Sequence, residues 1–547
     1  MVVVHAETEE LATHQRHPLD TRPVLPPFKP PTTNNESILP IIPLPTTPDT
    51  QGLLAGQRLF VRQFKITGNT VLTDQALVEL TQPYLNREVL FDEFSQLRDE
   101  ITRAYVDKGY INSGAVIPPQ TVKDGVIEIK VIEGRLVDIE YKTNGRLRES
   151  YVRHRLQQSG DEALNVYQLE QRLQQLQQDD RIQSVQAALV PTGERGKSHL
   201  RLTLIEATPI HSTLHLDNYE TPSVGAEAIR LNVAHNNLSG YGDRLEAGFD
   251  RSEGLWSANG RYQVSPNAGE TLFDLHVTHS ESEVIEAPFD RLDINSESST
   301  FGLTMSHAIT NTLHRTLRVS VAGAVRRSKS FLLGQPFSFS EGAEKGESKV
   351  TALRFGLDWS QRSGREVFVA RSLLSVGIDA LDATVHAGNM PDSEFSALLL
   401  QGQWARRLQW WNAQVFARGD LQLTNTPLLG LEQFSIGGHA TVRGYRESTL
   451  VRDQGWVVSV EGRVPLWQRR AARFDVGVFA DAGRAWNIGR VTSDKDTLAS
   501  VGLGLRYVLN KHFNIQLDWA KQLENVPDSA DDDFQDDGVH FRLSAEY

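Results

Sequence analysis

The chain has 547 residues, among them 56 lysines and arginines, 69 aspartates and glutamates and no cysteine, and its formal net charge is −13. The acidic balance argues against a nucleic-acid-binding protein, because affinity for phosphate comes from basic patches. The lack of cysteine excludes disulfides, thiolate metal sites and cysteine nucleophiles, and it is compatible with an oxidising envelope compartment. No stretch approaches the ~18 consecutive apolar residues of a membrane-spanning helix. Residues 1–5 lack the basic start and apolar core of a secretory signal.

The first 57 residues carry little that could build a packed core. Residues 18–57 are rich in proline, as in Pro23-Val24-Leu25-Pro26-Pro27, and this composition favours an extended, semi-rigid chain. Residues 8–15 have the composition of one short helix. We therefore predict an N-terminal segment over residues 1–57, made of a short helix and a proline-rich linker.

Residues 58–207 alternate strand and helix signals, and the same order occurs twice. Apolar residues at helical spacing predict one helix in each half, through Phe94, Leu97, Ile101 and Tyr105 in the first and Leu169, Leu173 and Leu176 in the second. Strand patterns flank these helices at residues 64–70, 126–131, 136–141 and 200–205. We therefore predict two small α+β domains, over residues 58–135 and 136–207, each near the lower end of the size range of domains.

From residue 208 onward, segments of about ten residues alternate apolar and polar side chains. In one of them the polar residues from His512 to Asp518 alternate with Phe513, Ile515, Leu517 and Trp519. We predict about sixteen such strands, and their connections alternate between two kinds. Short connections include residues 265–270 and 362–366, and long ones include 280–300, 328–349, 425–455 and 525–538. A soluble sandwich would also alternate, so the loop pattern and the even strand count favour a transmembrane β-barrel over residues 208–547.

The last nine residues alternate as well, and the chain stops on an aromatic side chain. The apolar positions there are Val539, Phe541, Leu543, Ala545 and Tyr547. A terminal aromatic suits the interface girdle of an outer-membrane barrel, and it resembles the signal that barrel-assembly machinery reads. The alternative interpretation is an ordinary terminal strand.

Several short stretches occur in an order that matches a known family. They are Lys108-Gly109-Tyr110, Val131-Ile132-Glu133-Gly134, Gly196-Lys197-Ser198, the turn at residues 237–243, Val442-Arg443-Gly444-Tyr445 in the long loop 425–455, and Phe479-Ala480-Asp481-Ala482-Gly483 on the thirteenth candidate strand. In this order they resemble the two-partner secretion transporters (the TpsB family, of the haemolysin- and haemagglutinin-secretion type), over about residues 58–547.

The resemblance implies two periplasmic POTRA domains followed by a sixteen-stranded barrel in the Gram-negative outer membrane. It implies a transporter without enzymatic activity, cofactor or metal. The POTRA domains would bind the N-terminal secretion domain of a large exoprotein of the adhesin or haemolysin type, and the barrel pore would export it. Outer-membrane lipid and the barrel-assembly machinery are further expected partners. A barrel-assembly insertase and a passive porin or receptor are the alternative interpretations. In the family an N-terminal helix plugs the barrel, and residues 8–15 are the candidate for it here.

The sequence predicts no catalytic site. It contains neither a G-x-S-x-G elbow nor an H-E-x-x-H motif. Gly196-Lys197-Ser198 resembles the end of a phosphate-binding loop, but Pro191 stands where that motif needs its first glycine. An alternating strand follows instead of a helix whose N-terminus could bind phosphate.

Arg443 and Asp481 are the residues from which we expect a specific contact. Ordering a loop of about thirty residues costs chain entropy, so folding it into a barrel requires an anchor. An arginine offers a planar donor fork that a carboxylate on the wall can accept at two positions. The alternative interpretation is a solvated Arg443 and an ordinary strand residue at Asp481. The loop motif also holds Val442, Gly444 and Tyr445, and the wall motif also holds Phe479 and Gly483.

Overall fold

The computed structural model describes residues 38–39, 58–156, 162–267, 269–469, 471–489, 495–510, 512–526 and 533–547. Its described residues fall into two compact units, one within residues 34–207 and the other from residue 208 to the C-terminus. The helix predicted at residues 8–15, with the plug assigned to it, lies outside the described residues. So does the proline-rich segment 18–57, apart from Ile38 and Leu39. None of the helices that the structure describes is long and apolar enough to cross a membrane.

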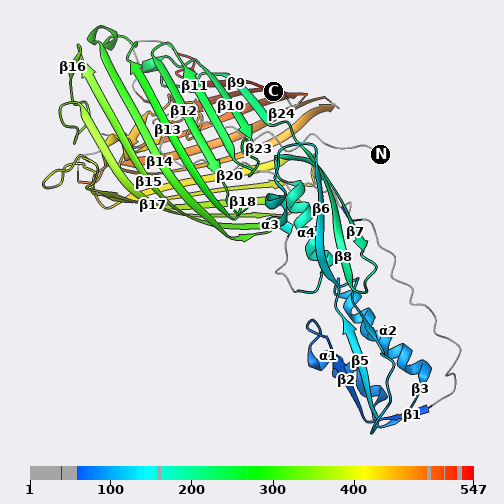
Figure 1. Cartoon of the computed structure of the whole chain (residues 1–547). Coiled ribbons are helices and arrows are strands. Elements are labelled where there is room, and N and C mark those ends of the chain that lie inside the picture. The colour runs from blue at the N-terminus through cyan, green and yellow to red at the C-terminus, as the bar shows by residue number, and fades with distance from the viewer. Residues whose placement is uncertain are drawn as a thin grey trace. The chain divides into compact units, whose positions relative to one another are not determined.

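The first half of the smaller unit is a sheet packed against a long helix (Figure 1). In the described part, β2 (Gln63–Thr67) pairs in parallel with β5 (Val126–Ile132), and β4 (Gly114–Val116) pairs antiparallel with the other side of β5. The helix α2 (Phe91–Asp107) buries the four residues that helical spacing predicted, in one core with the inward side chains of β5. The remaining elements are α1 (Asp74–Thr81), η1 (Gln82–Tyr84) and a ribbon of β1 (Arg58–Val61) and β3 (Arg87–Leu90).

Glu133, directly after β5, fastens three parts of this half together. Its carboxylate accepts hydrogen bonds from Thr70 N (2.5 Å), Val71 N (3.1 Å) and Tyr105 Oη (2.8 Å). Burial by itself raises the pKa of Glu133, but these hydrogen bonds outweigh burial and hold the pKa of the Glu133 carboxyl below its usual value. The ionised carboxylate is therefore the form that the fold stabilises.

The second half repeats the arrangement with a sheet of order β6-β8-β7. Its strands and helices are β6 (Arg135–Thr143), α3 (Glu149–Leu156), α4 (Val166–Gln177), β7 (Ile182–Pro191) and β8 (Lys197–Glu206). The residues Leu169, Leu173 and Leu176 are buried on one face of α4, as their spacing predicted. Gly196-Lys197-Ser198 leads into β8, which is a strand and not a phosphate-binding helix.

The two halves meet at the C-terminus of α2. Asn165 caps the N-terminus of α4 by accepting from Tyr167 N and Gln168 N, and its Nδ2 donates to Lys108 O at 2.9 Å. Val166 N also donates to Gly109 O at 2.9 Å. Gly109 has φ +91, and a Cβ there would lie 2.5 Å from the Tyr167 ring. The Lys108-Gly109 stretch is therefore the joint between the halves.

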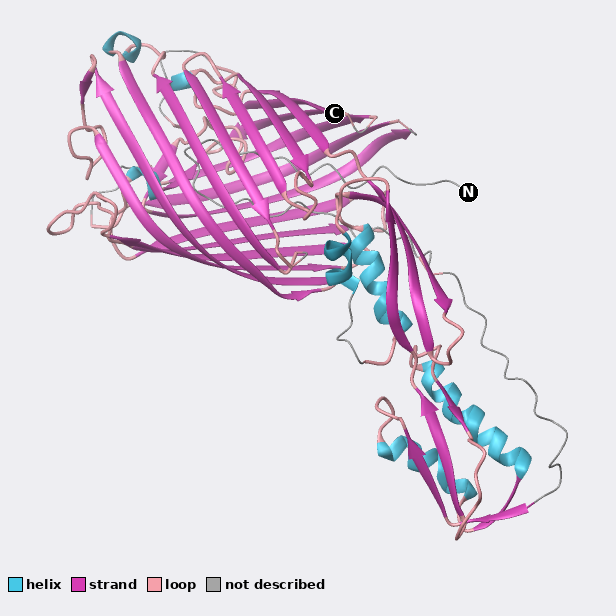
Figure 2. Cartoon of the chain, viewed as in Figure 1, coloured by secondary structure: helices cyan, strands magenta, loops and turns pink. Residues whose placement is uncertain are grey.

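The larger unit is a closed antiparallel barrel (Figure 2). Sixteen strands of the described residues close it, with β27 paired to β9, and the two-residue β16 (Gln335–Pro336) adds to the outer end of β15. In chain order the sixteen are β9 (Ile210–Asp217), β10 (Ala228–Asn236), β11 (Arg244–Arg251), β12 (Leu255–Val264), β13 (Thr271–Glu283), β14 (Ile294–Asn311), β15 (Arg315–Leu332), β17 (Glu347–Arg362), β18 (Glu366–Ile378), β19 (Ser396–Arg407), β20 (Gln414–Thr424), β23 (Gln454–Arg469), β24 (Ala472–Trp486), β25 (Thr497–Leu509), β26 (Phe513–Gln522) and β27 (Val539–Glu546). The predicted strand number and antiparallel order are confirmed.

Several strands are longer than the sequence predicted, and the loops between them are correspondingly shorter. β14 and β15 have 18 residues each, so both ends of the predicted loops 280–300 and 328–349 belong to strands. Charged residues there suggested loops, but they face one another across the sheet. Lys329 pairs with Glu297 at 3.5 Å, and Arg327 pairs with Glu347 at 2.6 Å. Opposite charges on neighbouring strands stabilise a ladder that continues beyond the apolar band.

The two faces of the barrel strands differ as the alternation predicted. On β26, the apolar residues from Phe513 to Trp519 are exposed on the outside, whereas Asp518 is buried inside. Inward polar side chains are paired along the wall, as with Arg506 and Asp518, whose Nη2 and Oδ1 lie 2.8 Å apart. The interior is thus a polar space lined by ion pairs.

The Glu133 contacts predict how the stability of residues 58–207 depends on pH. A carboxyl with a depressed folded-state pKa stabilises the fold above its unfolded-state pKa, about 4.3 for glutamate, and this contribution is lost as pH falls through the folded-state pKa. We expect the urea midpoint of this fragment to fall between pH 6 and pH 3. Glu133→Gln should lower the midpoint at pH 6 and show a smaller fall. A fall of equal size in the unchanged fragment and in Glu133→Gln would show that the pH dependence does not come from Glu133. Glu79→Gln, at an exposed position of α1, is the control.

Candidate functional site: a loop held in the barrel lumen

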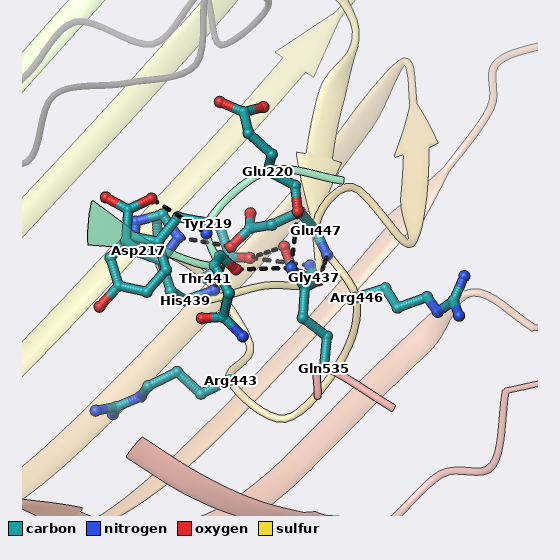
Figure 3. Close-up of polar contacts among 12 residues, drawn as sticks. Asp217, Tyr219, Glu220, Gly437, His439, Thr441, Arg443, Arg446, Glu447 and Gln535 are labelled. Carbon is teal, nitrogen blue, oxygen red and sulfur yellow. Dashed lines mark hydrogen bonds and ion pairs between the residues drawn. The ribbon is translucent and has the colours of Figure 1, made fainter. Parts of the chain in front are cut away.

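The connection between β20 and β23, residues 425–453, is folded against the inner wall of the barrel. We call it the lumen loop. It contains η4 (Gly430–Glu432) and a short ribbon of β21 (Phe434–Ile436) and β22 (Leu450–Arg452). The chain between the two ribbon strands, residues 437–449, forms the tip of the loop, which is drawn in Figure 3.

Arg443 is the residue through which the tip binds the wall. Its Nε donates to Asp481 Oδ2 at 2.8 Å, its Nη2 to Asp481 Oδ1 at 3.0 Å, and its backbone N to Asp481 Oδ2 at 3.1 Å. Its Nη1 donates to Glu461 Oε2 at 2.7 Å and lies 3.7 Å from Asp518 Oδ1. The guanidinium lies 3.4 Å from the centroid of the Phe479 ring, which gives it a cation–π contact as well. The structure thus brings Arg443 of the loop and Asp481 of β24, the thirteenth barrel strand, together in a bidentate contact.

Glycines allow the loop to approach the wall this closely. Gly444 has φ +89, and a Cβ on it would lie 2.7 Å from Ala520 Cβ of β26. On the wall, a Cβ on Gly483 would lie 3.0 Å from Trp456 O and 3.3 Å from Val442 Cγ2. The distance at Gly444 is shorter than real Cβ contacts, and the distances at Gly483 are tighter than most of them, so each glycine serves close packing of the loop on the strands.

Val442 and Tyr445 complete the contact on either side of Arg443. Val442 is fully buried in an apolar cluster that includes Leu498 of β25 and the loop residue Ile436. Tyr445 donates from its Oη to Ala499 O at 2.8 Å or Glu524 O at 2.9 Å. The loop is thus fixed by a buried apolar contact and a phenolic hydrogen bond in addition to the ion pair.

Sequence reasoning missed a second ion-paired contact of the lumen loop. Glu432 of η4 is buried, and its Oε1 lies 2.7 Å from Arg354 Nη2 and 3.3 Å from Arg326 Nη1. Arg326 is on β15 and Arg354 on β17, which register places side by side. The available signal was two inward arginines on neighbouring strands, Arg354 lying opposite Ala322, four residues from Arg326, but strand register is needed to recognise it.

The tip also contacts the loop that follows β9, the first barrel strand. The His439 ring stacks on the Tyr219 ring with centroids 3.6 Å apart and an interplanar angle of 5°. Glu447 holds His439 in place by accepting from its backbone N at 2.7 Å. Gln535, just before β27, accepts from Glu447 N at 2.9 Å and donates to Glu220 O at 2.7 Å. The loop tip therefore lies against the segments next to both strands that close the barrel (Figure 3).

Arg446 makes a third set of contacts. Its side chain points away from that of Arg443 in Figure 3. It lies 2.6 Å from Glu286 Oε1, in the connection between β13 and β14, and 2.5 Å from Asp536 Oδ1, before β27. The hydrogen bonds to Asp536 and Glu286 raise the pKa of Arg446 above its usual value, so it stays charged. The two arginines of the tip thus bind acidic groups on different sides of the loop.

The chain combines small α+β modules, a sixteen-stranded barrel and a loop bound inside that barrel through an arginine. This is the architecture of POTRA-bearing outer-membrane transporters. The family model described as "Haemolysin secretion/activation protein ShlB/FhaC/HecB" matches residues 196–507, and the model "POTRA domain, ShlB-type" matches residues 59–134. The chain belongs to this haemolysin secretion/activation family, as its motifs predicted.

Relatives and solved structures agree with this assignment. The outer membrane transporter CdiB of Dickeya dadantii is 24% identical over 76% of this chain and 74% of its own length. The heme/hemopexin transporter protein HuxB of Haemophilus influenzae is 22% identical over 84% of this chain and 82% of its own. The structure of CdiB from Escherichia coli has a TM-score of 0.69 at 21% identity, covering 92% of this chain and 94% of that one, and shows the same fold.

The family and its relatives identify the activity and the compartment. The protein is an outer-membrane transporter of two-partner secretion, it secretes a partner exoprotein, and its POTRA domains are periplasmic. The short turns, such as residues 265–270, therefore lie at the periplasmic end of the barrel, because the chain enters β9 from that side. The lumen loop connects two strands at the opposite, extracellular end.

The close approach of Gly444 predicts a sensitive position in the lumen loop. In Gly444→Ala the new methyl group clashes with Ala520 and φ becomes unfavourable, so the tip should leave the wall. A cysteine placed at Thr441, which is buried in the tip, should then react with a membrane-impermeant maleimide at least several-fold faster, which is measurable because the chain has no other cysteine. Gly402→Ala on β19 is the matched control, since a Cβ there meets no described atom within 4 Å. Unchanged labelling in Gly444→Ala would contradict the tight contact.

Proposed function

We propose that the lumen loop occupies the export path of the resting transporter, and that Arg443 and Asp481 hold it there until the partner protein passes. The observation that supports this is the set of acidic groups around one guanidinium. Asp481 and Glu461 both bind Arg443, and Asp518 lies near it. Without the loop, these carboxylates of β23, β24 and β26 would face one another across a small space. Arg463 and Arg506 of the wall already pair with Glu461 and Asp518, so the cation of the loop is the partner that Asp481 would lose.

The strength of this contact suits a loop that is held firmly and still released. Removing one partner of a buried ion pair costs about 3–5 kcal/mol, because the other charge stays buried and unpaired. When the whole loop moves out, Arg443 and the carboxylates are hydrated together, and the cost is smaller. A partner chain that threads the lumen and forms its own polar contacts can therefore displace the loop. In this proposal Glu432 holds the base of the loop on β15 and β17 while the tip moves.

We also propose that residues 58–135 and 136–207 are two POTRA domains that receive the partner. An unfolded chain can add as a strand to an exposed sheet edge, which gives affinity through backbone hydrogen bonds with little demand on sequence. In the described sheets, β6 and β7 are edges of nine and ten residues. The names of relatives such as the hemolysin transporter protein ShlB of Serratia marcescens support a large adhesin- or haemolysin-type exoprotein as the cargo. Outer-membrane lipid and the barrel-assembly machinery complete the proposed partners.

Substitution of the ion pair tests the role of the lumen loop. Arg443→Ala and Asp481→Ala should each reduce secretion of the partner strongly, while the barrel stays inserted and keeps its heat-modifiable gel mobility. The double variant should be little worse than either single one, because both remove the same contact. Secretion is measured as partner protein in the medium relative to transporter in the outer membrane. Arg315→Ala, at an exposed position of β15, controls for loss of a barrel arginine.

Normal secretion by both single variants, or losses that simply add, would show that this pair does not hold the loop.

Binding by the isolated fragment 58–207 tests the receptor. We expect the fragment to be soluble and to bind the N-terminal secretion domain of the partner in calorimetry or pull-down, because its strand edges are available. The barrel alone, residues 208–547, should bind it much more weakly. Binding by the full chain with none by the fragment would instead locate recognition in the barrel.

A further inference from the structure

A hollow on the outer face of the barrel has no role in the lumen chemistry. Its volume is about 780 Å³, and it lies over β23 and β24 near their periplasmic ends. The lining includes Trp411 and Asn412 from the turn between β19 and β20, Gly462 and Trp467 from β23, and Val478 from β24. Apolar side chains dominate this lining, and it faces away from the pore.

Particular residues of the sequence create the hollow. Gly462 occupies an outward position of β23, and a Cβ on it would meet no described atom within 4 Å, so a side chain is missing where its neighbours have one. The register between β23 and β24 shifts between Pro465 and Trp467, which bends the strand at the end of the hollow. Trp411 and Asn412 have φ values of 53° and 50°, a conformation that turns this connection sharply.

The side chains at the periplasmic rim of the hollow, which are those of Trp410, Trp411 and Arg469, indicate which kind of ligand it fits. Trp410 and Trp411 are 71% and 76% exposed, and their rings stack with centroids 5.6 Å apart. Tryptophans at the end of a transmembrane barrel lie at the boundary between the hydrocarbon and the lipid headgroups. The Arg469 guanidinium lies 5.5 Å from the centroid of the Trp467 ring, at the periplasmic end of β23. An apolar hollow below a tryptophan rim with an arginine fits an acyl chain below a phosphate.

We propose that this hollow is a binding site for an anionic phospholipid of the periplasmic leaflet. One acyl chain lies over Gly462, between the β23 and β24 side chains, and Arg469 binds the headgroup. The charge of Arg469 selects an anionic headgroup over a zwitterionic one. The site rests on the outer-membrane location of the barrel and not on the proposed role of the lumen loop, so each can fail separately.

The test is native mass spectrometry of the full chain, purified in detergent and titrated with phosphatidylglycerol or phosphatidylethanolamine. The unchanged protein should bind one phosphatidylglycerol in preference to phosphatidylethanolamine, by about fivefold for one arginine at the membrane surface. Arg469→Gln should lose this preference. Gly462→Leu should fill the hollow and abolish the saturable binding. Gly402→Leu is the matched control, because Gly402 also lies on the outward face with no described atom within 4 Å of its Cβ position.

Equal binding of the two lipids to the unchanged protein would overturn the selectivity for an anionic headgroup. Equal lipid binding by Gly462→Leu and Gly402→Leu would overturn the site itself. A Gly462→Leu protein that lacks heat-modifiable mobility is not folded, and Val478→Trp, which narrows the hollow from β24, then takes its place. Binding by Val478→Trp equal to that of the unchanged protein would likewise overturn the site.

Discussion

The structure depends on one constraint, that no backbone N–H or C=O group can remain unpaired in lipid. An open sheet would leave two strand edges in the hydrocarbon, so the chain closes by pairing β27 with β9, from Arg542 opposite Asp217 to Glu546 opposite Thr213. Closure fixes the alternation of every strand, with one set of side chains in lipid and the other in the lumen. The apolar outside and the charged inside are two consequences of the same closed ladder.

A closed polar lumen brings acidic residues together from distant parts of the chain. Glu461, Asp481 and Asp518 lie on β23, β24 and β26, and all three point inward. Like charges confined in this way need cations near them, and the wall supplies Arg463 to Glu461 and Arg506 to Asp518. Asp481 receives its cation from the lumen loop. Electrostatic balance of the lumen and the position of the loop are therefore coupled.

The lumen loop is held at several points of different chemistry. The Glu432 contact lies at its base, Arg443 binds the middle of the wall, and His439 and Arg446 contact segments next to β9 and β27. The outer face follows a different physical rule, because hydrocarbon selects for shape and apolar area. There the absence of a side chain at Gly462 and the tryptophans of the periplasmic rim make a hollow that lumen chemistry does not explain.

The sequence by itself did not predict α1 or α3 of the smaller unit. It determined the strand number, the antiparallel order and the two longest helices, α2 and α4, and it pointed to Arg443 and Asp481, which the structure brings together. It could do so because alternation and helical spacing are local, and because a short motif marks both ends of that contact. It overestimated the loops at 280–300 and 328–349, since a charged residue looks the same in a loop and in a cross-strand ion pair. The tertiary structure alone decided the partners of Glu432, the stacking of His439 on Tyr219 and the hollow at Gly462. Those features bring together loop and strand residues that are far apart in the chain, and their positions depend on the strand register, which is set when the whole barrel closes.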